Sequence, residues 1–205
     1  MAIYTKLDKE KVVSIISNYN LGNMKNYQGI KEGIENTNYL VETDKGRFIL
    51  TIYEKRVNKD DLPFFSKLMK ELSNKKFICP KPILNKNNKY INDLGSKKFM
   101  LVSYLEGKSK TNLSPDDCSS VGKQAARLHE ITKNFDFKRD NDLSVKSWRR
   151  IFDQVKDKCN RIHPDLPKLI ETNLEDVEKD WPENLPKGII CLLYTSDAAD
   201  EGLGV

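Results

Sequence analysis

The sequence predicts an α+β fold in which an antiparallel sheet region comes first and a helical region follows. Residues 39–53 alternate between two faces around a "TDKGR" turn, with Phe48, Leu50 and Ile52 on one face. From Ser114 onward the apolar residues recur at helical spacing, beginning with "SPDDCSSVGKQAARLHEIT". Because only one helical segment interrupts the strands, we expect a meander of hairpins rather than parallel βαβ units.

Five strands are expected before residue 107. Those between residues 26 and 55 are joined by hairpin turns, and Gly46 can take the positive φ that such a turn requires. Two more surround a turn at Gly95–Ser96. The second of these contains "FMLVSYL", which is almost wholly apolar and therefore typical of a central strand.

Capping residues indicate where the helices begin. Asp8 precedes a short amphipathic helix, and Asp60 or Asp61 precedes another that has Pro63 in its first turn. Ser114 precedes the clearest helix, whose first turn holds a proline and two aspartates that favour the positive end of the helix dipole. Two further amphipathic helices are expected in "SVKSWRRIFDQVKDKC" and "DLPKLIETNLEDVEKDW", and "LPKGII" leads into a strand.

Composition argues against several classes of function. The 205 residues carry a net charge of +5, but lysines are mixed with acids and no aromatic-basic cluster marks a nucleic-acid surface. No apolar run approaches the roughly 20 residues of a membrane span, and the first residues lack a signal-peptide pattern. The four cysteines are scattered, without metal-ligand or disulfide spacing. We therefore expect a cytoplasmic protein without nucleic-acid or membrane partners.

Polar residues in the first hairpin could bind an anion. In "GIENTN", a turn formed by Gly33, Asn36, Thr37 and Asn38 joins two strands and can direct backbone N–H groups at a phosphate. The alternative is an ordinary Asn-rich hairpin turn without a ligand.

The end of the apolar strand is a second candidate site. Kinase-like enzymes bind adenine through the backbone of a similar short polar linker between two lobes. In this sequence the resemblance would place the backbone of Ser103 and Leu105 there, with the side chain of Tyr104 alongside. An edge strand that leads into a turn is the alternative. His129 is a candidate general base, but it neighbours the apolar face of its helix, which favours a packed structural histidine.

Taken in order, these stretches resemble the aminoglycoside-phosphotransferase and choline-kinase type of small-molecule kinases, which share the protein-kinase-like two-lobe fold. Within that group the chain is most similar to the bacterial homoserine kinases of this fold. The resemblance implies a nucleotide-binding lobe over residues 1–106 and part of a helical lobe over residues 107–190. The matching stretches include "MAIYTKL", "GIKEGIENTNYLVETDKGRFILTIYEKRV", "DLPFFSKLMKEL", "CPKPI", "SYLEGKS", "AARLHEIT" and "WPENLPKGII".

The resemblance implies transfer of the γ-phosphoryl group of ATP, with Mg²⁺, to the hydroxyl of L-homoserine, a step of threonine biosynthesis. It places residues 33–38 over the phosphates and residues 103–105 beside adenine. Thr51 stands where many kinases of this fold carry a phosphate-pairing Lys or Arg, so Lys55 and Arg56 are nearby candidates for that cation. Glu71 is a candidate partner for a phosphate-lobe group. A choline, aminoglycoside or sugar kinase, or a nucleotide-binding pseudokinase, remain alternatives.

The last residues depart from the family pattern. After "LPKG-I-I" the family's catalytic loop has a pattern like His-x-Asp-x-x-x-x-Asn, but Cys191 and Leu193 stand at the His and Asp positions. The string "CLLYTSDAADE" is also the translation of a transposase-end sequencing adapter. We therefore expect residues 191–205 to be a non-native tail on a truncated kinase that lacks phosphotransfer activity. A naturally divergent C-terminus is the alternative.

Overall fold

The computed structural model describes residues 3–32, 35–55, 57–108, 110–185 and 188–189. The described residues up to Phe137, together with Ile189, form one compact unit, and Lys138–Gly188 form a second. Within these ranges no helix is long and apolar enough to cross a membrane. The first unit continues beyond residue 106 to include one more helix, while the expected boundary between two lobes stays a prediction.

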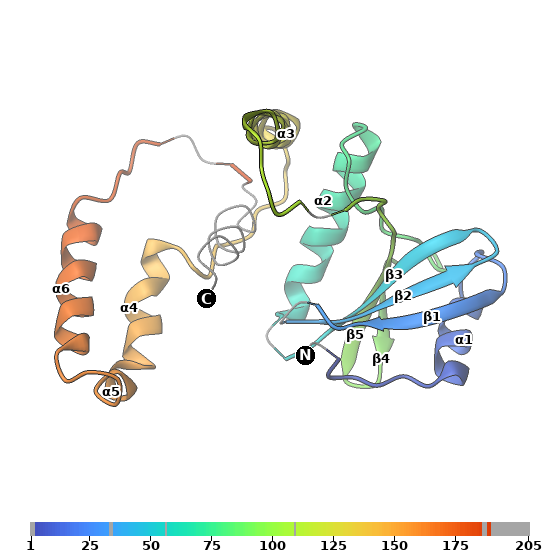
Figure 1. The fold of residues 1–205 in the computed structure, drawn as a ribbon, viewed down its shortest axis with the longest axis horizontal. Coiled ribbons are helices and arrows are strands. Elements are labelled where there is room, and N and C mark those ends of the chain that lie inside the picture. Colours follow the sequence, from blue (N-terminus) through green and yellow to red (C-terminus); the bar gives the residue numbers. More distant parts are fainter. Residues whose placement is uncertain (1–2, 33–34, 56, 109, 186–187, 190–205) are drawn as a thin grey trace. The chain divides into compact units, whose positions relative to one another are not determined.

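The first unit is built on a five-stranded antiparallel sheet (Figure 1). The strands are β1 (Met24–Ile30), β2 (Thr37–Thr43), β3 (Gly46–Tyr53), β4 (Ile91–Leu94) and β5 (Lys97–Ser103). Their order is β1-β2-β3-β5-β4, so β5 is an interior strand, which confirms the prediction from its apolar sequence. Gly46 and Gly95 lead into β3 and β5 with φ of +124° and +60°, where other residues would be strained.

One face of the sheet forms the hydrophobic core together with helix α1 (Lys9–Ser17). The helix begins as predicted, because the Asp8 carboxylate accepts a hydrogen bond from the Lys11 N–H at 2.7 Å. Full burial of each large aliphatic side chain is worth about 1.5–3 kcal/mol. The core includes Val12, Ile15 and Ile16 of α1 and Tyr39, Val41, Phe48, Leu50, Ile52, Phe99 and Leu101 of the sheet.

Helix α2 (Leu62–Asn74) contacts β4 and follows a short 3₁₀ turn, η1 (Lys59–Asp61). Asp61, one of the two predicted aspartates, stands at the N-cap position, but its side chain makes no capping hydrogen bond. The Asn58 side chain instead accepts a hydrogen bond from the Asp60 N–H. Because the 3₁₀ turn begins earlier than the α-helix, the capping role falls to the residue before that turn.

Helix α3 (Pro115–Thr132) begins at Ser114, as the sequence predicts. The Ser114 hydroxyl accepts a hydrogen bond from the Asp117 N–H at 3.2 Å, and the Asp117 carboxylate accepts one from the Ser114 N–H at 2.9 Å. At the other end of the helix, the Lys75 ammonium that follows α2 donates to the Ile131 carbonyl at 3.1 Å. This contact links α3 to the end of α2 within the first unit.

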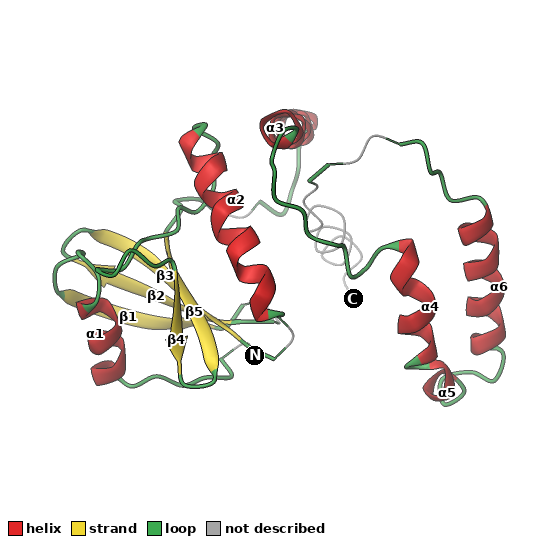
Figure 2. Ribbon diagram, turned by 180° about the vertical axis from the view of Figure 1, so that it is seen from behind, coloured by secondary structure: helices red, strands yellow, loops and turns green. Residues whose placement is uncertain are grey.

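The second unit is helical (Figure 2). Its helices are α4 (Val145–Asp153), α5 (Lys156–Cys159) and α6 (Leu166–Lys179). The first of the two expected helices is interrupted, so that α4 and α5 take its place. Arg149 pairs with Glu178 at 2.9 Å, and the rings of Trp148 and Trp181 meet edge to face at 5.0 Å. Of the strand expected in "LPKGII", three residues lie outside the described ones, and Leu185, Gly188 and Ile189 are not in a strand.

Candidate functional site

An apolar row of side chains crosses the sheet on the face opposite to α1. Leu40 of β2 pairs with Ile49 of β3, which in turn pairs with Val102 of β5. These residues alternate with the core residues of the same strands, so they point to the other face. An apolar strip that ends at the beginning of the linker is the kind of surface on which a planar ring can lie.

A more polar row lies beside the apolar one, nearer to the first hairpin turn. Asn38 of β2 pairs with Thr51 of β3, and Thr51 pairs with Met100 of β5. The Thr51 hydroxyl donates to the Asn38 side-chain oxygen at 2.9 Å. Both polar side chains are half-buried. The structure thus brings together two predicted site residues that are 13 positions apart.

The linker after β5 offers an unused backbone donor. The N–H of Ser103 bonds to the Lys81 carbonyl at 2.8 Å, and the N–H of Tyr104 bonds to the Arg47 carbonyl at 3.1 Å. Within the described part of the chain the N–H of Leu105 has no partner. The Lys81 N–H donates to the Ser103 hydroxyl at 2.9 Å and therefore does not occupy the Ser103 carbonyl. Leu105 thus offers a free donor and Ser103 a free acceptor, and the binding of adenine by this pair stays a prediction.

The Tyr104 side chain is held by a charged pair that the sequence did not point to. The Arg47 guanidinium lies 4.4 Å from the centre of the Tyr104 ring and forms an ion pair with Glu106. Together with the backbone bond to Arg47, these contacts fix the linker against β3. The role predicted for Tyr104 beside adenine stays a prediction.

Thr37 lies on the core face, away from the Asn38 and Thr51 side chains. Its side chain is fully buried, and its hydroxyl donates to the Glu54 carboxylate at 2.8 Å. A side chain in this position cannot reach a ligand on the other face, so only the Thr37 backbone stays a candidate for phosphate binding. Burial favours a raised pKa for Glu54, but hydrogen bonds from Lys97, Thr5 and Thr37 outweigh it and lower that pKa.

Of the remaining predicted turn residues, the structure describes Asn36 but not Gly33. The Asn36 side chain accepts a hydrogen bond from the Glu54 N–H at 3.4 Å, which holds it at the end of β3. Gly33 lies outside the described residues, as does Arg56. Lys55 is exposed just after β3. The choice between these two cations therefore remains a prediction.

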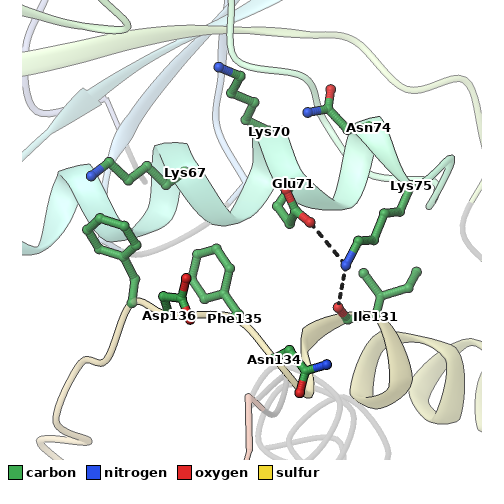
Figure 3. Close-up of a pocket in the computed structure, with 10 residues that line it drawn as sticks. Lys67, Lys70, Glu71, Asn74, Lys75, Ile131, Asn134, Phe135 and Asp136 are labelled. Carbon is green, nitrogen blue, oxygen red and sulfur yellow. Dashed lines mark hydrogen bonds and ion pairs between the residues drawn. The ribbon is translucent and has the colours of Figure 1, made fainter.

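Glu71 lies in a hollow of about 400 Å³ between α2 and the segment that follows α3 (Figure 3). Its carboxylate pairs with Lys75 at 3.0 Å. Three lysines and two phenylalanines also line this hollow, which is separate from the two rows on the sheet. The lining residues are Lys67, Lys70, Glu71, Asn74, Lys75, Ile131, Asn134, Phe135, Asp136 and Phe137.

The structure tests the expectation for His129 but not the expectations for the catalytic-loop positions. His129 is exposed near the end of α3, so the expectation of a packed structural histidine is wrong. Its position just beyond the buried Leu128 turns it outward, because consecutive helical residues point about 100° apart. Cys191 and Leu193 lie outside the described residues. In the described part, no three His, Cys, Asp or Glu side chains gather as a metal site.

Comparisons of sequence support a phosphotransferase. The model of the phosphotransferase enzyme family matches residues 26–190. The homoserine kinase of Chelativorans sp. (strain BNC1) is 37% identical over 190 residues, and that of Methylobacterium nodulans is 38% identical over the same length. Each alignment covers 93% of this chain and 59% of the relative, so the chain spans about three fifths of the length of the curated relatives it matches.

Comparisons of structure support the same fold. A spectinomycin phosphotransferase, solved with ADP and spectinomycin, superposes with a TM-score of 0.54 at 12% identity, covering 88% of this chain and 60% of the other. A microcompartment-associated aminopropanol kinase superposes with a TM-score of 0.53 at 16% identity, covering 69% and 48%. Since the family model matches most of its residues, the chain belongs to the phosphotransferase enzyme family.

Proposed function

We propose that this chain is the nucleotide-binding part of a homoserine kinase, an enzyme that transfers the γ-phosphate of ATP to the hydroxyl of L-homoserine in threonine biosynthesis. The observation that carries this proposal is the 35–38% identity, over 190 residues, to relatives named homoserine kinase. The nucleotide lobe would comprise residues 1–106, followed by part of the helical lobe over residues 107–190. The scattered cysteines suit the reducing cytoplasm.

The two rows on the sheet would give each end of ATP a matching surface. The Ser103 carbonyl and the Leu105 N–H would bind the edge of adenine, while Ile49 and Val102 would lie under its ring. The polar Asn38 and Thr51 would face the phosphates from the next row. Side chains held in advance lose little entropy when a ligand binds, which favours affinity.

Mg²⁺ is expected to accompany ATP in such an enzyme, since it neutralises the charge of the phosphates when it is bound. The described residues do not provide a cluster of ligands for it. We therefore assign no step of the reaction to residues of the described part. Its contribution is to bind and orient the nucleotide, and positioning accounts for much of phosphoryl-transfer catalysis.

The substrate is tested on the protein that the source genome encodes at this locus. A panel of L-homoserine, choline, an aminoglycoside, a sugar and aminopropanol is offered with ATP and Mg²⁺. We expect the highest kcat/KM for L-homoserine. Equal use of the substrates, or a preference for another one, would refute the homoserine assignment.

The nucleotide site is tested with Thr51→Val, using Thr43→Val in the neighbouring strand as a matched control. The Thr43 hydroxyl donates to the Gly46 carbonyl at 3.3 Å, at the far end of the hairpin. Because the Thr51 hydroxyl donates its one proton to the Asn38 oxygen, it would direct the Asn38 NH2 group at the phosphates. A hydrogen bond to a charged group is worth about 1.5–3 kcal/mol, so releasing Asn38 through Thr51→Val should weaken ATP binding roughly tenfold or more. Thr43→Val should not change it. An equal effect of the two variants would contradict the placement of the phosphates.

A further inference from the structure

A buried polar cluster lies behind the candidate phosphate site, on the core face of the sheet. The Glu54 carboxylate, just after β3, accepts hydrogen bonds from the hydroxyls of Thr5 at 2.6 Å and Thr37 at 2.8 Å. The Lys97 ammonium at the start of β5 forms an ion pair with the same carboxylate. We call Thr5, Thr37, Glu54 and Lys97 the Glu54 cluster.

The Glu54 cluster is well satisfied for its degree of burial. The side chain of Glu54 is only 9% exposed, whereas that of Lys97 is 32% exposed. The Thr37 oxygen also accepts hydrogen bonds from the N–H groups of Tyr4 at 2.9 Å and Thr5 at 3.1 Å. Networks of this kind hold their members in one arrangement, because losing one partner leaves another buried group unpaired.

The segment Ile3–Leu7 runs behind the first hairpin and is bonded to it at several points. The Tyr39 hydroxyl donates to the Thr5 carbonyl at 2.9 Å and accepts from the Leu7 N–H at 3.0 Å. Ile3 packs so closely on Gly29 of β1 that a Cβ there would lie 2.5 Å from its side chain. The segment therefore contacts both strands that flank the hairpin turn.

The position of Thr37 links this cluster to the nucleotide side of the sheet. Thr37 and Asn38 are consecutive in β2, so their side chains point to opposite faces. Fixing the Thr37 hydroxyl on Glu54 therefore fixes the direction in which Asn38 points. Glu54 also contacts the hairpin turn directly, since its backbone N–H donates to the Asn36 side-chain oxygen.

We propose that the Glu54 cluster is a positioning device: by holding Thr37 on the core face it keeps Asn36 and Asn38 oriented toward the nucleotide. This role rests on the nucleotide-binding function proposed above. Thr37 would then be a positioning residue whose side chain contacts no substrate. Its hydroxyl would affect affinity through the conformation of β2.

The test compares Thr37→Val with Thr43→Val, the same change in a buried threonine at the other end of β2. Residue-resolved amide exchange of the 205-residue chain is measured at Asn38 and, as a reference for global opening, at Leu50. We expect Thr37→Val to increase exchange at Asn38 at least tenfold more than at Leu50. Thr37→Ser, which keeps the hydroxyl, should stay within about threefold of the unmodified chain.

Thr43→Val should leave the ratio of Asn38 to Leu50 exchange unchanged. The half-buried Thr5→Val provides a milder variant should Thr37→Val fail to fold, and it should raise the same ratio. Equal ratios in the Thr37, Thr5 and Thr43 variants would overturn the positioning role, as would a failure of Thr37→Ser to restore slow exchange.

ATP titration of the same proteins separates this inference from the proposed function. Thr37→Val should weaken ATP binding at least fivefold, with Thr37→Ser and Thr43→Val close to the unmodified chain. An altered exchange ratio with unchanged ATP affinity would overturn the link between the cluster and the nucleotide. If the unmodified chain bound no ATP, the proposed function would fail, while the exchange ratios would still decide whether the cluster orders β2.

Discussion

The ion pair between Glu54 and Lys97 should contribute measurably to the stability of the sheet unit. Glu54→Gln keeps the shape of the side chain but removes its charge. A glutamine has one acceptor oxygen and can keep at most two of the three donors that the carboxylate binds. Because a hydrogen bond to a charged group is worth about 1.5–3 kcal/mol, we expect a loss of about 2–3 kcal/mol for Glu54→Gln.

The Lys97→Met variant keeps the apolar stem of the side chain and removes the ammonium. Its cost should be smaller, about 1–2 kcal/mol, since Lys97 is one-third exposed and solvent screens its charge. The double variant should be less destabilised than the sum of the two, with a coupling of about 1–2 kcal/mol. Urea unfolding followed by amide exchange at Leu50 and Ile52 measures each value.

The unfolding of the second unit serves as an internal control, and the pH dependence of stability serves as a second one. Both tryptophans, Trp148 and Trp181, lie in the second unit, so fluorescence should show no shift of that unit's transition. Since the pKa of Glu54 is lowered in the folded state, its contribution is present above the unfolded value of about 4.3 and is lost as pH falls below it. Additive effects at pH 7 within about 0.3 kcal/mol would refute the coupling.

Three further outcomes follow from the described contacts. Ser114→Ala should cost α3 about 1 kcal/mol, seen as faster amide exchange in its first turn; unchanged exchange would argue against the capping box. Burial raises the pKa of Tyr19 and Tyr53 to about 12, so their ultraviolet titration should occur at higher pH than that of exposed tyrosines. The stability that these neutral phenols contribute is present below about pH 10 and should be lost as the pH rises toward 12. Full ionisation of both by pH 11 would contradict this. Gly29→Ala should cost about 1–3 kcal/mol by pushing Ile3 aside, and Ile3→Ala should relieve that cost; no relief would mean that the strain lies elsewhere.

Local signals in the sequence were sufficient for most of the fold. The cap at Ser114, the turn at Gly46 and the interior position of β5 each depend on residues close together in the chain. The 3₁₀ turn before α2 and its cap at Asn58 escape prediction because apolar spacing does not reveal such a turn. His129 was misplaced because a residue next to an apolar face can point either inward or outward.

The candidate site was predicted in part, and its missing parts are contacts between distant residues. The alternation that places Tyr39 and Val41 in the core also places Thr37 there, so this correction could have been drawn from the sequence. The ion pair of Glu54 with Lys97 joins positions 43 apart, and no local pattern indicates it. The same holds for Arg47 and Glu106, which meet only because β3 and β5 are neighbours.

Nucleotide binding is tested most directly by titrating the ¹⁵N-labelled chain with ATP and following its backbone amides. The two rows of side chains and the free donor of the linker predict the largest shifts at Leu105, Asn38 and Thr51, with GTP producing much smaller ones. Shifts confined to the hollow around Lys67 and Phe135, or equal shifts with both nucleotides, would contradict the placement of the site on the sheet.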